Sequence, residues 1–155
     1  MASIESERFF LIPFSVLVRF VESGGSGSFG GEFLASTEYV TLTGTMPGPD
    51  LPMTFYAHAM VAINSTCSMV IGGYSNGYSA STFYYDRNEG EWINGPSLMQ
   101  ARERHAAGIV TDEVTDENFV AVTGGYGYRD LDSTEILQDG EWVQGRISNT
   151  ICHLL

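Results

Sequence analysis

Short apolar runs, some of them alternating with polar residues, follow one another along the chain and are separated by glycine-containing turns. Between residues 105 and 144 there are four of them: HAAGIV at 105–110, NFVAVTGG at 118–125, STEIL at 133–137 and EWVQ at 141–144. Alternation with a period of two is typical of β-strands, and Asp139-Gly140 favours a type I′ hairpin turn between the last two runs. No helical period of 3.6 residues is sustained. The pattern therefore predicts four short antiparallel strands in this stretch.

The preceding residues carry the same arrangement. Its four runs are FYAHAMVAI at 55–63, SMVIGGY at 68–74, STFYYD at 81–86 and, after the turn Asn88-Glu89-Gly90, EWIN at 91–94. Phe9–Val18 (FFLIPFSVLV) adds strand material further upstream. A unit of four strands that recurs at a fixed spacing indicates a repeat architecture.

Four independent markers share a period of 47–52 residues. They are the glycine pairs that end at Gly25, Gly73 and Gly125, the tryptophans Trp92 and Trp142, the histidines His58, His105 and His153, and the echo of Gly48–Leu51 (GPDL) in Gly95–Leu98 (GPSL). Four short antiparallel strands per period of this length are typical of a β-propeller blade.

This pattern resembles the kelch repeat: a double glycine after an apolar strand, an aromatic pair further on, and a tryptophan after a short turn. The residues that carry the resemblance are Gly72, Gly73, Tyr85 and Trp92 in one period, and Gly124, Gly125 and Trp142 in the next. The later period has Ile136 or Leu137 in place of the tyrosine. The earliest period lacks the tryptophan, because Thr45 stands at its position, and Gly30-Gly31 makes the placement of its glycine pair ambiguous. In kelch blades these residues are structural, so the resemblance implies a fold rather than a ligand.

The expected fold is all-β, a partial kelch-type β-propeller of about three four-stranded antiparallel blades. The predicted divisions are an N-terminal tail (1–7), a degenerate first blade (8–53), two kelch blades (54–99 and 100–149) and the start of a further blade (150–155). A closed propeller needs about four to eight blades. We therefore expect that further blades are needed to close it, and that the chain is part of a longer propeller.

The charge balance restricts the partners. The chain has 19 acidic residues against seven arginines, no lysine and a net charge of −12. Nucleic acids and anionic membranes both require clustered cations, so neither is expected as a partner. A protein partner steered by charge would be basic, and the alternative is an acidic surface that only promotes solubility.

Targeting signals are weak. Cys67 and Cys152 are too few for a disulfide scaffold and favour a reducing, intracellular compartment such as the cytoplasm. The apolar run at 9–18 is too short to span a bilayer, and Glu5 and Glu7 precede it where a signal peptide would have basic residues.

The residues offer little for catalysis or cofactor binding. The three histidines at equivalent positions invite a metal site, but neither cysteine completes a zinc-ligand set at a typical spacing. Some kelch-type propellers are copper oxidases with a tyrosine–cysteine pair, and Cys67 has no such surroundings. We therefore expect no enzyme, no metal and no cofactor.

The resemblance implies a protein-interaction module, such as the substrate-recognition part of a ubiquitin ligase adaptor or a scaffold. The alternatives are an oxidase- or sialidase-like propeller enzyme fragment and a non-functional truncated propeller. The candidate contact loops are Ser75–Ser79, Glu113–Asn118 and Tyr126–Asp132, with candidate binding residues Tyr74, Tyr78, Tyr126, Tyr128 and Arg129. Loops rich in tyrosine, glycine and serine resemble adaptable binding surfaces.

Overall fold

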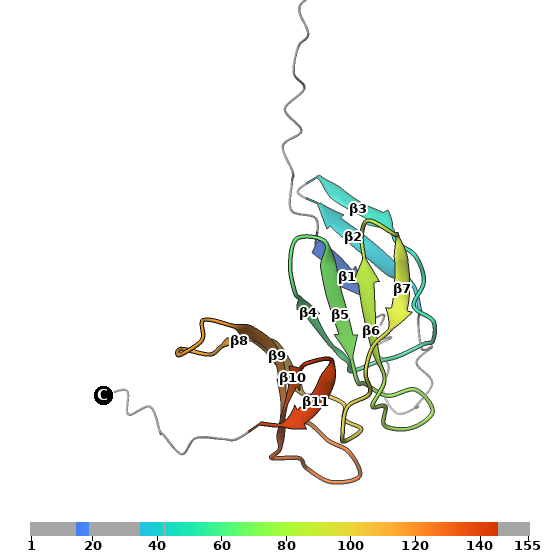
Figure 1. Ribbon diagram of the computed structural model, residues 1–155. Helices are drawn as coiled ribbons and strands as arrows, with labels where there is room; N and C mark the ends of the chain where they lie inside the picture. Colours follow the sequence, from blue (N-terminus) through green and yellow to red (C-terminus); the bar gives the residue numbers. More distant parts are fainter. Residues whose placement is uncertain (1–14, 19–34, 42, 146–155) are drawn as a thin grey trace, which may run out of the picture.

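The computed structural model describes residues 15–18, 35–41 and 43–145, and they form three antiparallel sheets (Figure 1). The first sheet contains β1 (Ser15–Val18), β2 (Thr37–Thr41) and β3 (Gly44–Pro47). The second contains β4 (Ala59–Ala62), β5 (Cys67–Ile71), β6 (Thr82–Asp86) and β7 (Glu91–Asn94). The third contains β8 (Ala106–Thr111), β9 (Asn118–Thr123), β10 (Thr134–Gln138) and β11 (Glu141–Gln144).

In each sheet, every strand pairs with the next one along the chain. Short connections make this order possible, since antiparallel neighbours need only a tight turn. The turn between β10 and β11 is the two-residue hairpin that Asp139-Gly140 predicted: both residues have positive φ, 51° and 81°, and Gln138 pairs with Glu141. Positive φ at both central positions is the signature of a type I′ turn.

The second and third sheets have equivalent registers. Trp92 of β7 lies opposite Tyr85 of β6, and Trp142 of β11 lies opposite Leu137 of β10. In the first sheet Thr45 lies on β3 at the matching position. The register therefore places Thr45 where the other two sheets carry a tryptophan.

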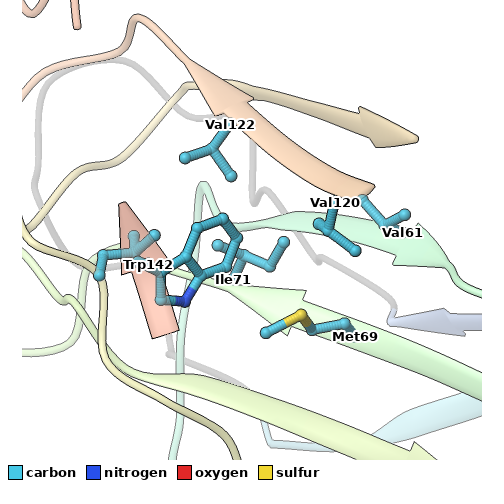
Figure 2. Packing of buried hydrophobic residues seen from close by; sticks show 7 residues of the cluster. Val61, Met69, Ile71, Val120, Val122 and Trp142 are labelled. Carbon is cyan, nitrogen blue, oxygen red and sulfur yellow. The ribbon is translucent and has the colours of Figure 1, made fainter. Parts of the chain in front are cut away.

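The main core lies between the second and third sheets (Figure 2). Met69 and Ile71 of β5 meet Val120 and Val122 of β9, and the indole of Trp142 closes the cluster. β4 lies alongside β8, so the first strands of the two sheets are neighbours. A second cluster joins the segments before β4 to the opposite face of the second sheet, through Leu51, Phe55, Val70 and Phe83, with Ala35, Met60 and Trp92 packed against it.

Each tryptophan is tied to the Gly-Pro segment that follows the preceding sheet. The indole Nε1 of Trp142 donates to the carbonyl of Pro96 over 2.9 Å, and that of Trp92 donates to the carbonyl of Pro49 over 2.9 Å. The hydroxyl of Thr82 also donates to the Pro96 carbonyl, at 2.8 Å. The repeated GPDL and GPSL segments therefore supply backbone acceptors between neighbouring sheets.

Two glycines are required where the sheets approach one another. Gly73 has φ of 99°, and a Cβ there would lie 2.8 Å from the carbonyl oxygen of Tyr56. Gly125, at the matching position, has φ of 89°, and a Cβ would overlap the carbonyl oxygen of Glu103. Any side chain at these positions would meet both a steric clash and an unfavourable backbone conformation.

The all-β prediction is confirmed, and the described residues contain no helix. The strands predicted across residues 55–144 match β4–β11 to within a few residues. Of the predicted strand at 9–18, only Ser15–Val18 lies within the described residues, as β1. The glycine pairs at Gly25 and Gly31, His153 and the segment 150–155 lie outside them.

Candidate interaction surface

Five tyrosines form a connected cluster at one end of the second and third sheets. Ring centroids lie 5.2 Å apart between Tyr56 and Tyr74, and 5.4 Å apart between Tyr74 and Tyr78. Tyr78 then contacts Tyr126 at 5.5 Å and Tyr128 at 4.7 Å. These separations and the tilted or edge-to-face geometries are those that aromatic pairs prefer. We call these five residues the tyrosine cluster.

The glycine pairs position the cluster. Tyr74 and Tyr126 each follow a glycine pair, where the chain leaves the second strand of a sheet. Isolated antiparallel bridges then join Tyr74 to Tyr56 and to Tyr78, and a matching pair of bridges joins Tyr126 to Glu103 and to Asp130. The two loops therefore have the same backbone pairing, and the cluster crosses from one sheet to the next.

The structure brings together four of the candidate binding residues, Tyr74, Tyr78, Tyr126 and Tyr128. Tyr128 is 81% exposed and Tyr126 38%, while the other three are partly buried. Arg129 lies in the same loop and is exposed. Tyr56 was missed, because it stands inside an apolar run that the sequence assigns to a strand.

The loop Glu113–Asn118 lies at the other end of the third sheet. It joins β8 to β9, and the Thr111↔Asn118 pair closes that hairpin at the end away from Tyr126. The candidate loops therefore do not form one surface, because successive hairpins of a meander turn at opposite ends.

A buried carboxylate lies close to the tyrosine cluster. The side chain of Glu103 is 9% exposed, and its Oε1 lies 3.9 Å from Nε of Arg104, whose side chain is 73% exposed. Burial raises the pKa of Tyr56 and of Tyr78, and the negative charge of Glu103 adds to both rises. The carboxylate is thus within electrostatic reach of both phenols.

Two of the equivalent histidines lie just inside this end of the sheets. Burial lowers the pKa of His58 to about 4, and burial together with the charge of Arg102 lowers that of His105 to about 4. Both imidazoles are therefore neutral near pH 7. Within the described ranges, no group of three or more His, Cys, Asp and Glu side chains could hold a metal ion.

Arg102 is fully buried, which its place in the polar run ARERH did not predict. Its guanidinium donates to the carboxylate of Glu135 at 2.8 Å, to the hydroxyl of Ser133 at 2.9 Å and to the carbonyls of Gly124 and Ser133 at 2.9 and 3.0 Å. In the preceding repeat Phe55 and Phe83 occupy the same two positions, with ring centroids 5.7 Å apart. One repeat therefore uses an ion pair where the other uses two apolar rings.

The motif residues lie between sheets. Tyr85 contacts Trp92 with ring centroids 5.1 Å apart, and its hydroxyl is hydrogen-bonded to that of Tyr39 on the first sheet. Burial, with the hydrogen bond to Tyr39, raises the pKa of Tyr85 to about 12. This phenol therefore stays protonated and able to donate at physiological pH.

Neither the comparison with protein-family models nor that with curated proteins found a match to the chain. Among the residues that the structure describes, no helix is long and apolar enough to cross a membrane.

Proposed function

We propose that the chain consists of kelch-type propeller blades and binds a protein partner through the tyrosine cluster. Two observations support the blade assignment. The second and third sheets share strand order and register, and their first strands, β4 and β8, are neighbours, as in a propeller. A tryptophan on the last strand of each of these two sheets donates a hydrogen bond to the segment that follows the sheet before it.

The binding role is carried by one observation: five tyrosines gather at one end of two sheets, and Tyr128 leaves 81% of its surface exposed. Tyrosine is enriched in protein interfaces because it provides a large contact area and a polar hydroxyl at a low cost in side-chain entropy. A network of ring contacts within the cluster reduces that entropy cost further, since the rings are already ordered.

The partner favoured by charge is a basic protein. The net charge of −12 attracts cations and accelerates their diffusional encounter at low salt. A substrate-recognition part of a ubiquitin ligase and a scaffold would both act by binding a protein partner, so the proposal applies to either role.

Photo-cross-linking from the two ends of the third sheet tests the proposal. A benzoylphenylalanine at Arg129, beside the cluster, is compared with one at Val114, which is 93% exposed in the loop at the other end. Proteins cross-linked in cell extract are identified, purified and titrated against the wild-type chain. We expect a purified partner that cross-links from position 129 and not from 114, and whose affinity falls at high salt.

Equal cross-linking from both positions, or no purified protein that binds the wild-type chain, would overturn the proposal. Thermal melting of both labelled chains checks that the probes leave the fold intact. Tyr128→Leu then measures the contribution of the exposed ring. We expect the affinity for the partner to drop roughly tenfold, as for a central aromatic contact.

A further inference from the structure

The backbone of Glu103 is fixed by hydrogen bonds, while one oxygen of its carboxylate lacks a hydrogen-bond donor. Its N–H donates to the carbonyl of Tyr126 at 2.9 Å, and the N–H of Tyr126 donates back at 2.9 Å. Its side chain is 91% buried, and none of the described residues donates a hydrogen bond to its Oε2. Buried polar atoms in folded proteins nearly always have a hydrogen-bond partner, so we expect this oxygen to accept a hydrogen bond from a donor outside the described residues.

The tyrosine cluster lies next to Glu103, because its member Tyr126 is the backbone partner of Glu103. Burial raises the pKa of Tyr56 and of Tyr78, and the negative charge of Glu103 adds to both rises, so Glu103 is within electrostatic reach of two members of the cluster. The ring planes of Tyr78 and Tyr128 are inclined at 74°. Tyr128 is 81% exposed in this edge-to-face pair, and the face of a tyrosine ring attracts cations.

We infer that the tyrosine cluster and Glu103 together bind the guanidinium of an arginine side chain on the protein partner. The inference rests on the proposed function and specifies its chemistry. A guanidinium is planar and weakly hydrated, stacks on aromatic rings and donates two parallel hydrogen bonds to a carboxylate. A lysine ammonium is a strongly hydrated point charge and satisfies this combination less well.

Arg104 supports this assignment and provides a competitor within the chain. Its guanidinium lies beside Oε1 of Glu103, but 3.9 Å is longer than a hydrogen bond, and its side chain is 73% exposed. An incoming arginine displaces it at little cost, because Arg104 is largely exposed to solvent and makes no hydrogen bond to the carboxylate at this distance. Removing Arg104 should therefore strengthen binding of an external arginine, a result that a purely structural role of Glu103 would not produce.

Titration of the full chain with short peptides, followed by NMR of the tyrosine rings, tests the inference. The probes are acetyl-Gly-Arg-Gly-amide and the same peptide with lysine, trimethyl-lysine or citrulline in place of arginine. We expect the arginine peptide to bind with a dissociation constant on the order of 1 mM and to shift the cluster resonances. The lysine peptide should bind several-fold more weakly, and neutral citrulline should cause no saturable shift.

Matched variants separate local recognition from overall charge. Glu103→Gln should weaken arginine binding roughly tenfold, since it removes the charge of the acceptor. Glu113→Gln, with the same change in net charge in the loop at the other end, should leave binding unchanged. Arg104→Ala should tighten binding about twofold to fivefold, whereas Arg87→Ala, in the turn between β6 and β7, should not.

Three results would each overturn the inference: citrulline binding as well as arginine, trimethyl-lysine binding more tightly than arginine, or equal affinities of the Glu103→Gln and Glu113→Gln chains. If Glu103→Gln fails to fold, the comparison of Arg104→Ala with Arg87→Ala decides alone. A partner that cross-links from position 129, together with no binding of the arginine peptide, would contradict this inference and leave the proposed function in place. Failure of both the cross-linking and the peptide binding would contradict both proposals.

Discussion

The indole Nε1 of Trp142 donates a 2.9 Å hydrogen bond to the carbonyl oxygen of Pro96, 46 residues earlier in the chain. Trp92 has the same relation to Pro49. The donor lies on the last strand of one sheet and the acceptor in the segment that leaves the sheet before it. Each of these hydrogen bonds therefore joins two neighbouring sheets and spans about one repeat of the sequence.

Truncation of Trp142 should separate the contribution of the ring from that of the hydrogen bond. We expect Trp142→Ala to destabilise the fold by about 3–5 kcal/mol, because a buried aromatic leaves a cavity between two sheets. Trp142→Phe should cost only about 1–2 kcal/mol, because the Thr82 hydroxyl still donates to the Pro96 carbonyl. Urea unfolding measures both.

Val143→Ala is the matched control for these variants. Val143 follows Trp142 on β11 and is 37% exposed, so its truncation should cost less than about 1 kcal/mol. If Trp142→Ala unfolds at the same urea concentration as wild type, Trp142 does not hold the two sheets together.

The buried pair Arg102–Glu135 should be strongly coupled. Arg102→Phe alone leaves the Glu135 carboxylate buried without its cation and should cost about 3–5 kcal/mol. Adding Glu135→Phe recreates the apolar pair that Phe55 and Phe83 form in the preceding repeat. The double variant should therefore be more stable than Arg102→Phe, even though the backbone N–H groups of Met99 and Gln100 lose their acceptor.

A double-mutant cycle by urea unfolding measures this coupling. We expect a coupling energy of about 1–3 kcal/mol between the two positions. Strict additivity of the two single changes would show that the ion pair contributes nothing beyond its separate residues.

The stability of the fold should fall as the pH drops from about 6.5 to about 4. His58 and His105 have folded-state pKa values of about 4, below the ordinary value of 6.5, so between these limits the unfolded chain binds more protons than the folded one. Both histidines are neutral in either state above this window, and the stabilisation is then fully present. Each pKa unit corresponds to about 1.4 kcal/mol.

Unfolding by urea at pH 7.5, 5.5 and 4.5 measures this dependence. His105→Asn should flatten the decline, because it removes one of the two groups and leaves the carboxylates of the chain as they are. If the His105→Asn variant loses stability as steeply as wild type over this window, the pH dependence comes from other groups. The variant keeps Arg102 and His58, which both lower the pKa of His105 in the wild-type chain, so only the titration of His105 itself is removed.

Two glycines with similar backbone angles should respond very differently to alanine. Gly125 has φ of 89°, and a methyl group there would overlap the carbonyl oxygen of Glu103; Gly140 has φ of 81° with nothing within 4 Å. Gly140→Ala should cost about 1–2 kcal/mol, the price of a left-handed conformation alone. Gly125→Ala should cost at least about 2 kcal/mol more, measured as the difference in thermal or urea unfolding. Equal losses of stability in the two variants would mean that the backbone around Gly125 shifts enough to relieve the clash with the Glu103 carbonyl.

Much of the fold could be predicted from local pattern. Short apolar runs, the turn residues between them and the glycine pairs marked the strands from β4 to β11, because all three are set by residues close to one another along the chain. Asp139-Gly140 marked its hairpin for the same reason. The loops of the tyrosine cluster were marked by composition, and four of its five members are among the candidate binding residues, although their contacts with one another were not predicted.

The remaining features depend on contacts between residues far apart in sequence. The polar run ARERH shows no sign that Arg102 is buried, because its partner Glu135 lies 33 residues later. Tyr56 joins the cluster through its pairing with Tyr74, and Glu103 is brought beside the cluster through its pairing with Tyr126; no local period reveals either pairing. The sequence by itself determined the strands, the turns and the period. Only the tertiary structure decided which side chains meet between sheets, because that depends on how the backbones dock.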